Sequence, residues 1–427
     1  MRIATRLPSP RVALAALTGI NLFNYLDRYV LGAVLPAMTA GLGISDTQAG
    51  SLPTVFILTF ALVSPVAGVL GDKQPRFRLA AIGVLVWSLA TCASGLAQTF
   101  AALALARAIT GVGEASYTVV TPSLLSDFYP PARRSGALAR FYAAIPIGSA
   151  AGFLLGGEVN AHWGWRAAFF VAGAPGAVLA LVLLAFRDPP RGAHDVGPNA
   201  GHDRLPSAAE EATATALSGA GALRALWARK SYVFNTAAQT LYTFTVGGLA
   251  IWMPTYFVRV HHLPLRAADL GFGGILVAAG FVGTLAGGRA GDRLAARRAD
   301  GHFLVAAISL IASLPFTLVA LLHPSPAIFW PAMFASLTLL FVNGGPLNAA
   351  MANVLPPDLR ARGFSIYSLV MHLLGDAPSP FIIGVVSSRM GIAVPVLAIA
   401  LLPVLAGLVL LAGRASLRRD LAAGRGT

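Results

Sequence analysis

The sequence GVLGDK, at residues 68–73, ends one apolar run of this chain, and GRAGDR, at residues 288–293, ends another 220 residues later. Both read Gly-x-x-Gly-Asp-(Lys/Arg). A second pair of polar loops begins at Pro130 and at Pro356, 226 residues apart. Equivalent loops at a nearly constant offset indicate a duplicated unit, and duplicated halves around a central cavity are a design of membrane transporters.

Composition indicates that most of this chain's surface does not meet water. Of the 427 residues, 56% are hydrophobic and only 11% are charged, whereas soluble domains have about 25% charged residues. The mean hydropathy is +0.72. A spanning helix needs about 20 apolar residues, and the chain has twelve such stretches, at residues 12–38, 47–70, 78–97, 100–127, 136–158, 165–186, 231–257, 268–290, 302–322, 327–354, 362–387 and 392–413.

The repeat and the twelve stretches predict an all-α membrane protein with twelve transmembrane helices in two pseudo-symmetric six-helix bundles. The bundles are residues 1–186 and residues 231–427, and the second ends in a short cytoplasmic tail. A polar cytoplasmic linker at residues 187–230 joins them, and its last part, from residue 221, is expected to form a short helix on the membrane surface. Prolines inside the stretches are expected to kink their helices, because each leaves a carbonyl without its usual donor.

The distribution of basic residues supports the count of twelve. The chain has 31 Lys and Arg residues against 17 Asp and Glu residues. With both termini in the cytoplasm, 25 basic residues fall in cytoplasmic gaps or at the ends of the stretches beside them. Four fall in or beside outer gaps, and two lie deep inside helices, which is the positive-inside pattern. The basic excess therefore indicates membrane topology and not nucleic-acid binding. The Ala- and Arg-rich composition favours the inner membrane of a high-GC bacterium.

Four charged residues lie inside two of the apolar stretches: Asp27 and Arg28 in the first, Arg107 and Glu114 in the fourth. A charge in hydrocarbon costs about 2.5–3.5 kcal/mol on insertion scales, so such residues usually face a watery cavity. At 1.5 Å per residue, Asp27 and Arg28 lie about 22–24 Å along the first helix, and Glu114 lies about 21 Å along the fourth, which runs the opposite way. Arg107 is two turns from Glu114 on the same face, so all four are expected near one depth.

These four charges can neutralise each other in more than one pairing, which allows a switch. We expect Arg28 to pair with Glu114 and Arg107 to lie near Asp27, with the partners exchanging as the halves rock. Burial favours a protonated carboxyl and a nearby guanidinium favours an ionised one, so Asp27 and Glu114 are the candidates for carrying a coupled proton. The two arginines also suit an anionic head group. The alternative is a static, neutral cluster that only holds the two helices together.

Helix eleven carries a further titratable pair. His372 and Asp376 are four residues apart, so they share a helical face and can hydrogen-bond. They are candidates for solute binding or a proton relay, and the alternative is that they only orient the helix. Candidates to line an apolar cavity, with core packing or lipid contact as the alternative for each, are Phe23, Tyr25, Tyr117, Tyr142, Tyr242, Phe244, Trp252, Phe341 and Met371. Charges at helix ends are expected at the outer surface: Glu158, Arg166, Arg259, Arg266, Asp269 and Arg389.

Twelve helices in two halves, with Gly-x-x-Gly-Asp-(Lys/Arg) after helices two and eight, resemble the major facilitator superfamily. In that family this loop latches the two halves together on the cytoplasmic side, so the resemblance implies a gating role for Asp72 and for the basic Lys73 and Arg76. The family's Asp-Arg-x-Gly-Arg continuation is only partly kept, as DKQPR at residues 72–76. Further gating residues are expected at the end of helix four and in the second latch: Asp127, Arg133, Arg134, Asp292 and Arg293.

A narrower resemblance, to the Spinster branch, rests on three blocks. They are NYLDR at residues 24–28, Arg107 with EASY at residues 114–117 and Pro122, and HLLGDAPSP at residues 372–380. Members of that branch are linked to proton-dependent secondary transport of lysophospholipids and sphingoid phosphates, so the same activity is expected here.

The leading hypothesis is thus a proton-coupled secondary transporter that moves an amphipathic, anionic lipid-like solute by alternating access. A drug or organic-anion exporter of the same superfamily is the alternative, followed by a channel or scramblase. The chain has no Walker A loop, no H-E-x-x-H or G-x-S-x-G motif and no metal-ligand cluster, so no enzyme activity, metal or cofactor is expected. Its one cysteine, Cys92, allows no disulfide within the chain. The expected partners are the lipid bilayer, the solute and protons, with no nucleic acid, and the protein is expected to be a monomer.

Overall fold

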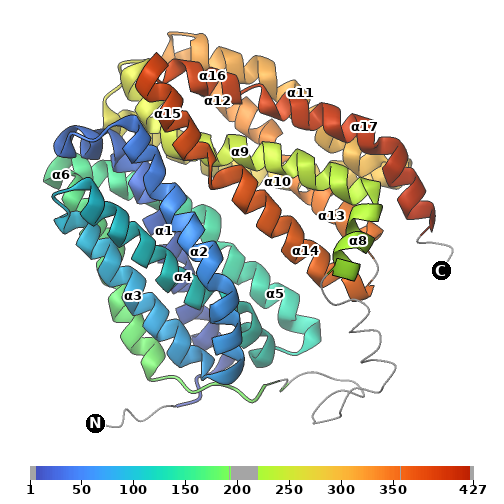
Figure 1. The fold of residues 1–427 in the computed structure, drawn as a ribbon, viewed down its shortest axis with the longest axis horizontal. Helices are drawn as coiled ribbons and strands as arrows, with labels where there is room; N and C mark the ends of the chain where they lie inside the picture. The colour runs from blue at the N-terminus through green and yellow to red at the C-terminus, as the bar shows by residue number, and fades with distance from the viewer. Residues whose placement is uncertain (1–5, 192, 194–219, 356, 424–427) are drawn as a thin grey trace. The chain divides into compact units, whose positions relative to one another are not determined.

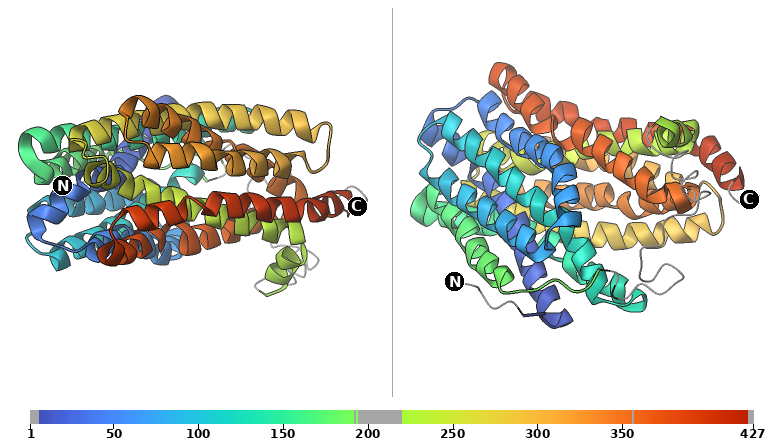
Figure 2. Two further views of the ribbon diagram at one scale, coloured as in Figure 1. Left: turned by 90° about the horizontal axis from the view of Figure 1, so that it is seen from above. Right: turned by 60° about the horizontal axis from the view of Figure 1, so that its bottom comes forward.

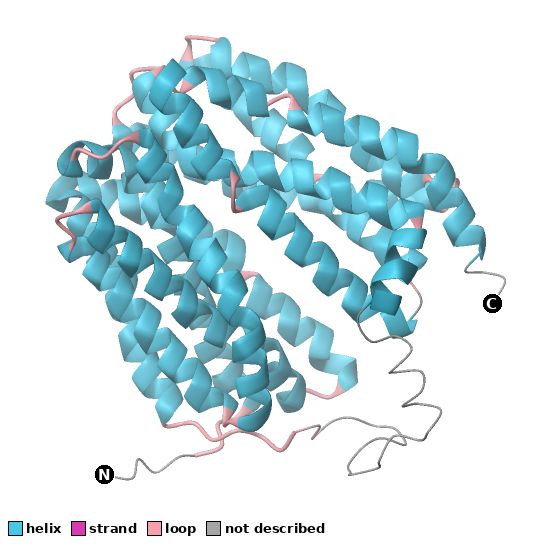
Figure 3. Cartoon of the chain, in the orientation of Figure 1, coloured by secondary structure: helices cyan, strands magenta, loops and turns pink. Residues whose placement is uncertain are grey.

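The computed structural model describes residues 6–191, 193, 220–355 and 357–423, without the side chains at 72, 131, 132, 135, 220–222, 357, 358 and 360–362. Every named element within these ranges is a helix (Figure 3), and the β pairing recorded there is one isolated bridge between Arg6 and Phe186. The predicted all-α class is confirmed.

The helices are labelled in Figure 1. Those before the linker are α1 (Pro10–Leu42), α2 (Asp46–Lys73), α3 (Arg76–Leu96), α4 (Phe100–Phe128), α5 (Pro131–Tyr142) and α6 (Ala144–Leu184). Those after it are α8 (Ala220–Ala228), α9 (Lys230–Arg259), α10 (Leu265–Ala295), α11 (Gly301–Leu322), α12 (Pro326–Phe341), α13 (Gly344–Val354), α14 (Pro357–Met371), the π-helical turn η1 (His372–Asp376), α15 (Ser379–Met390), α16 (Ala393–Ile399) and α17 (Leu402–Ala423).

Each of the twelve predicted spans is mostly helical. Among the described residues, nine helical segments are long and apolar enough to cross a membrane. One of them, Gly136–Leu184, holds two predicted spans, which meet at Gly164, where a φ of +79° bends the chain in a way that glycine tolerates. The two remaining spans are α1 and α4, the long helices that carry the internal charges.

Several spans are broken where the sequence predicted continuous helices. Breaks lie near Tyr142, Val342, Asp376 and Ile399, and each of these residues stands four positions before a proline. A proline cannot donate a hydrogen bond to the carbonyl four residues earlier, so the helix ends or changes pitch there. Helix α5 also starts at Pro131, five residues before the predicted start, because proline fits the first turn of a helix.

The described residues fall into two compact units. The first holds the described parts of Met1–Arg204 together with Ala250–Gly274 and Pro380–Ile392, and the second holds the rest. The predicted linker lies largely outside the described residues, since 192 and 194–219 are not among them. The short helix predicted from residue 221 is present as α8.

In the first unit, α1 packs on the first half of α6; Figure 2 shows the helices of the chain from two further sides. Gly148, Gly152 and Gly156 are spaced four apart and form a stripe on α6. A Cβ atom on Gly152 would lie 2.6 Å from the carbonyl oxygen of Leu26. Small residues at this spacing let two membrane helices approach closely, so the stripe holds the middle of α1, where two of the internal charges sit, against α6.

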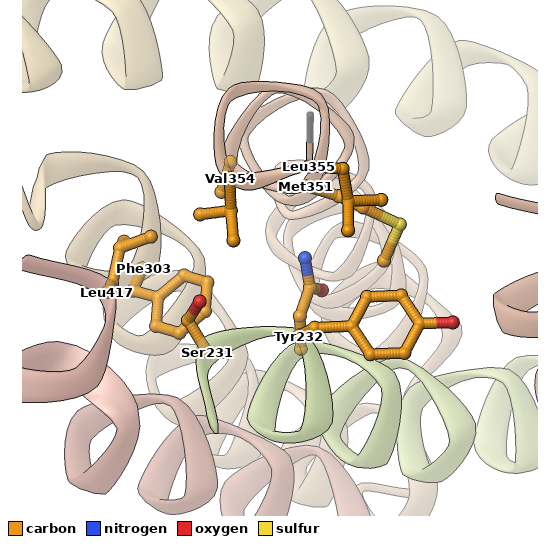
Figure 4. A pocket seen from close by; sticks show the side chains of 9 residues that line it. Ser231, Tyr232, Phe303, Met351, Val354, Leu355 and Leu417 are labelled. Atoms are coloured by element: carbon orange, nitrogen blue, oxygen red, sulfur yellow. The ribbon is translucent and has the colours of Figure 1, made fainter. Parts of the chain in front are cut away.

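In the second unit, the start of α9 is held by its neighbours (Figure 4). The Ser231 hydroxyl donates to Asp420 at 2.6 Å, Tyr232 donates to the carbonyl of Gly363 at 2.9 Å, and the Asn235 amide donates to that of Leu347. The space between these side chains does not admit a water molecule. This region is therefore packed core and not a binding site.

Candidate functional site

The four internal charges of α1 and α4 meet inside the first unit. Glu114, Asp27 and Arg107 are 0%, 1% and 2% exposed, while the Arg28 side chain is 26% exposed. Of these four side chains, Arg28 is therefore the one that reaches the surface. The similar depth predicted from the antiparallel helices is confirmed by the ion pairs that these residues form.

Arg28 holds Glu114 with two nitrogens. Its Nε lies 2.8 Å and its Nη2 lies 2.7 Å from the same oxygen, Oε2 of Glu114. Hydrogen bonds between ionised partners at such distances are among the strong ones in proteins. The predicted pairing of Arg28 with Glu114 is present.

Arg107 and Asp27 form a looser pair, with Nη1 and Oδ1 3.5 Å apart. Helix α3 lies between them: Thr91 donates to Oδ2 of Asp27 at 2.8 Å, and the Nη2 of Arg107 donates to Thr91 at 3.3 Å and to Ser94 at 3.1 Å. Neither Thr91 nor Ser94 was predicted to belong to the site. Two hydroxyl residues three apart in an apolar helix were the available signal, since they share a face.

Aromatic rings surround the exposed end of Arg28. The guanidinium carbon lies 5.0 Å from the ring centre of Tyr25, 5.1 Å from that of Phe56 and 5.3 Å from that of Phe60. A cation over a ring face within about 6 Å is attracted by the ring's quadrupole. Tyr25 was a predicted residue of the site, whereas the two phenylalanines of α2 were missed, because nothing in the sequence sets which face of α2 turns toward α1.

Tyr117 does not line a cavity in this structure, contrary to expectation. It is fully buried, its hydroxyl donates to the carbonyl of Leu17 at 2.5 Å, and its ring packs edge-on against Trp87. Trp252, another expected lining residue, is also fully buried and donates to the carbonyl of Pro380. Both residues therefore match the alternative expectation of core packing. In each, the buried polar group donates to a backbone carbonyl, as buried polar groups usually do.

His372 and Asp376 form the predicted contact in the second unit. The Nδ1 of His372 lies 3.0 Å from Oδ2 of Asp376, across the π-helical turn η1. Asp376 packs close to α9, since a Cβ on Gly247 would lie 2.5 Å from its own Cβ. Such π-helical turns occur frequently at functional sites.

The predicted gating residues differ in what they contact. Arg76 is buried and its Nη1 lies 2.6 Å from Oδ2 of Asp127, so it joins the start of α3 to the end of α4. Asp127 was expected beside Arg133 and Arg134, but Arg133 is exposed and Arg134 donates to the carbonyl of Ser126. The first turn of α5, which starts early at a proline, displaces them. Lys73, Asp292 and Arg293 are exposed, and the side chain of Asp72 lies outside the described residues.

The first residues of the linker form hydrogen bonds with the end of α2 and the start of α3. Asp188 accepts the backbone N–H groups of Arg76 at 2.6 Å and Phe77 at 2.9 Å, which caps the start of α3. Arg191 donates to the carbonyls of Gly71 and Gln74 at the end of α2. Asp188 and Arg191 were expected only to form part of the linker, because their contacts depend on where the chain returns after α6.

At the predicted outer side, two ion pairs join segments within the first unit. Arg259 binds both oxygens of Asp46, at 2.6 and 2.9 Å, and Ser387 donates to the same carboxylate at 2.5 Å. Arg266 pairs with Glu158 at 2.6 Å. Asp269 was expected at the outer surface, but it is fully buried. It lies four residues inside α10 and faces α6 instead of water.

Comparisons with known proteins add a family context to this geometry. The family model described as Major Facilitator Superfamily matches residues 17–375. The chain is 33% identical over 399 residues to protein spinster homolog 3 of Danio rerio, covering 89% of this chain and 77% of that protein. It is 34% identical over 394 residues to human protein spinster homolog 1 (88% and 72% covered), and 31% identical over 406 residues to the sphingosine-1-phosphate transporter SPNS2 of Danio rerio (90% and 77% covered).

Solved structures with a similar fold include other membrane transporters. A crystal structure of a bacterial homolog of the human lysosomal transporter Spinster matches with a TM-score of 0.86 at 23% identity, covering 97% of this chain and 98% of that one. A nucleoside transporter, NupG, matches with a TM-score of 0.69 at 15% identity, covering 94% of this chain and 98% of that one. At these identities the likeness concerns the arrangement of helices alone.

Proposed function

Because this chain belongs to the Spinster family of the major facilitator superfamily, and is therefore a multi-pass membrane transporter and not an enzyme, we propose that it couples solute movement to protons. The solute we propose is an amphipathic, anionic lipid-like molecule, moved by alternating access. The observation that carries the proposal is the buried network in which Arg28 holds Glu114 while Arg107 and Thr91 hold Asp27.

Protonation of either carboxylate would release an arginine. Asp27 and Glu114 are buried, and a buried charge that loses its partner is strongly destabilising. When Glu114 takes a proton, Arg28 loses its counter-ion and must find another anion. The second carboxylate of the network or an anionic solute can supply it, and this exchange links proton binding to a change in helix contacts.

The head group of the solute is proposed to bind Arg28. This arginine is the more exposed of the two, and its planar guanidinium suits phosphate. The rings of Tyr25, Phe56 and Phe60 around it supply apolar surface for the adjacent part of the solute. Arg107, whose buried end is occupied by Asp27, Thr91 and Ser94, is proposed to respond to the solute only after Asp27 is protonated. His372 and Asp376, which contact each other across η1, are proposed as further solute-binding residues.

Lysophospholipids and sphingoid phosphates are the proposed solute classes. One zebrafish relative is named as a sphingosine-1-phosphate transporter, and both classes join a phosphate to an apolar tail. The remaining proposals are cytoplasmic termini, residence in a bacterial inner membrane, a monomeric state and a gating role for the Arg76–Asp127 pair.

The test is uptake into liposomes that contain the purified protein, with labelled lysophospholipid or sphingoid phosphate and an imposed pH gradient. Asp27→Asn should abolish gradient-driven accumulation and leave folding intact, as judged by gel filtration. Asp300→Asn is the matched control, because this carboxylate is held by arginines far along the chain from the network. Accumulation by Asp27→Asn with an unchanged dependence on the gradient would remove Asp27 from the coupling mechanism.

The same liposomes test the head group. A dephosphorylated analogue should fail to compete with the labelled phosphate, and Arg28→Lys should raise the KM more than it lowers the maximal rate. Equal competition by the neutral analogue would contradict an anionic head-group site at Arg28.

A further inference from the structure

A carboxyl group that plays no part in the proposed mechanism is sealed between two helices of the first unit. Asp269 is 0% exposed, and no residue in the described part of the chain donates a hydrogen bond to either of its oxygens. Its Oδ2 would lie 2.7 Å from a Cβ atom built on Gly157 of α6. The carboxyl group therefore rests directly on the backbone of α6, in a place that only a glycine leaves open.

The contacts that flank Asp269 along α10 all lie on the side that faces α6. One turn toward the helix start, Arg266 of α10 binds Glu158 of α6, and both are partly exposed. One turn further along, the ring of Phe272 packs edge-on against Phe153 with centroids 5.3 Å apart, and both are buried. The carboxyl group thus lies between an ion pair that reaches water and an aromatic pair that excludes it.

An ionised carboxylate is poorly accommodated there. An isolated charge in a low-dielectric interior is costly, and the group usually takes up a proton instead. The start of a helix favours negative charge within its first turn, but Asp269 lies beyond the first turn of α10, and no described backbone N–H donates to it. The helix end therefore does not replace the missing partner.

Among the described residues, each cation near Asp269 has another contact or lies exposed to water. The charged groups nearest to it on α10 and α6 are Arg266 and Glu158, which pair with each other, and His162, which lies 3.5 Å from Glu158. The other arginine of α6, Arg166, donates to the carbonyl of Ala97 and lies over the ring of Trp165. The remaining charged residues of α10 lie at its opposite end, at residues 289, 292 and 293. The outer part of α1, which packs on α6, has no charged residue after Arg28. At the end of α9, Arg259 binds Asp46. Just after α9, the His261 ring is tilted against the rings of Tyr256 and Phe257, and His262 is exposed.

We propose that Asp269 is a second proton-binding site of this transporter, protonated while the start of α10 packs on α6 and ionised when the two segments separate. The inference deepens the proposed function, since it rests on a transporter whose helices part during the cycle. In its packed form the site stores one proton behind the Arg266–Glu158 pair. Separation exposes the carboxyl group to water, where the proton leaves, and the resulting charge disfavours repacking until a proton returns.

The test measures the contact itself. In a Cys92→Ser background, which removes the one native cysteine, Ala161→Cys on α6 and Ala267→Cys on α10 place spin labels on exposed positions of the two segments. Distances between the labels are then measured by pulsed electron spin resonance in nanodiscs over a series of pH values. The ratio of separated to packed molecules should rise by about tenfold per pH unit above the midpoint, as expected for one linked proton.

Asp269→Asn, which mimics the neutral acid, should stay packed at every pH. The double variant Arg266→Gln/Glu158→Gln, which removes the ion pair without freeing its arginine, is a control for the neighbouring charged groups. His162→Gln and His261→Gln are the controls for the histidines. All three should keep the pH response. A wild-type distance that does not change with pH, or an Asp269→Asn variant that responds as the wild type does, overturns the proposal.

Two further measurements remove ambiguity. Infrared difference spectra of the unlabelled wild type follow the carbonyl band of protonated carboxyl groups, so they report the proton even if the variant is unstable, and the absence of such a band in the packed form overturns the proposal. Proton-driven uptake by Asp27→Asn is measured separately. Normal coupling in that variant would contradict the role proposed for Asp27, while the pH response of the label distance decides Asp269 on its own.

Discussion

The contact between Arg28 and Glu114 illustrates how strongly a buried charge constrains its surroundings. Glu114 is fully buried and meets two guanidinium nitrogens within 2.8 Å. Once one helix of a membrane protein carries such a carboxylate, a neighbouring helix must supply a cation or the carboxylate must be protonated. This requirement made the pairing predictable from the depth of the two residues alone.

Arg28→Ala should lower the free energy of unfolding by about 3–5 kcal/mol, because it leaves Glu114 as an uncompensated buried charge. The double variant Arg28→Ala/Glu114→Gln should recover most of that loss. Denaturant unfolding in detergent measures both. Arg266→Ala is the control, since its ion pair with Glu158 is exposed and should be worth at most about 1 kcal/mol. Glu114→Gln is also measured alone. If the losses of stability in Arg28→Ala and Glu114→Gln simply add up in the double variant, the two residues are not coupled.

Asp300 offers a pH dependence outside the spanning segments. Burial raises the pKa of its carboxyl group, but hydrogen bonds from Arg414 and Arg298 outweigh burial and hold the pKa below the ordinary 3.8. A carboxylate with a lowered pKa stabilises the fold above its unfolded-state pKa, and that stability is lost as the pH falls through the folded-state value.

In the acid range below about pH 4, the melting temperature of the wild type should therefore fall more steeply than that of Asp300→Asn. Arg414→Ala should make the decline smaller, because it removes one of the hydrogen bonds that lower the folded-state pKa. Scanning fluorimetry across this range gives both curves, and parallel curves for the wild type and Asp300→Asn would refute the assignment.

At the scale of helices, the stripe of small residues on α6 decides how closely α1 approaches. Gly148, Gly152 and Gly156 each leave room that the backbone or side chains of α1 occupy. The position of Asp27 and Arg28 relative to α4 depends on this packing, because α1 also contacts α4 and α6 holds it in place.

Gly152→Ala should destabilise the protein by about 1–3 kcal/mol, as expected for overpacking, because its Cβ would meet the carbonyl of Leu26. Gly274→Ala on α10 is the matched control. A Cβ there meets nothing within 4 Å, so a gain of up to about 1 kcal/mol is expected from helix propensity. Thermal unfolding in detergent compares them, and equal effects would show that the close approach at Gly152 is not maintained.

Helix ends and breaks were only partly predictable. The spans followed from apolar length, and kinks at prolines were expected. The π-helical turn at residues 372–376 and the separate start of α13 were not. A proline removes one backbone hydrogen bond, but whether the helix bends, changes pitch or stops depends on which neighbouring groups satisfy the freed carbonyl.

At the scale of the whole molecule, the charge asymmetry of the loops makes a direct prediction. In a Cys92→Ser background, Arg389→Cys should react with a membrane-impermeant thiol reagent in intact cells. Arg293→Cys, in the second latch loop, should react only after permeabilisation, because the positive-inside rule assigns that loop to the cytoplasm. Both positions are exposed, so accessibility to reagent is set by topology. Labelling in the reverse order would contradict cytoplasmic termini.

Read alone, the sequence was enough for the helical class, the twelve spans, the family and the Arg28–Glu114 pair. These depend on hydropathy, on spacing along one helix and on the cost of burying a charge. Which face of each helix turns inward was decided only by the tertiary structure. That choice brought Thr91 and Ser94 to Asp27, placed three rings around Arg28, moved Tyr117 into the core, returned Asp188 to cap α3 and buried Asp269 against Gly157. The physical reason is that rotation about a helix axis is set by the summed packing of all its neighbours, which no single stretch of sequence contains.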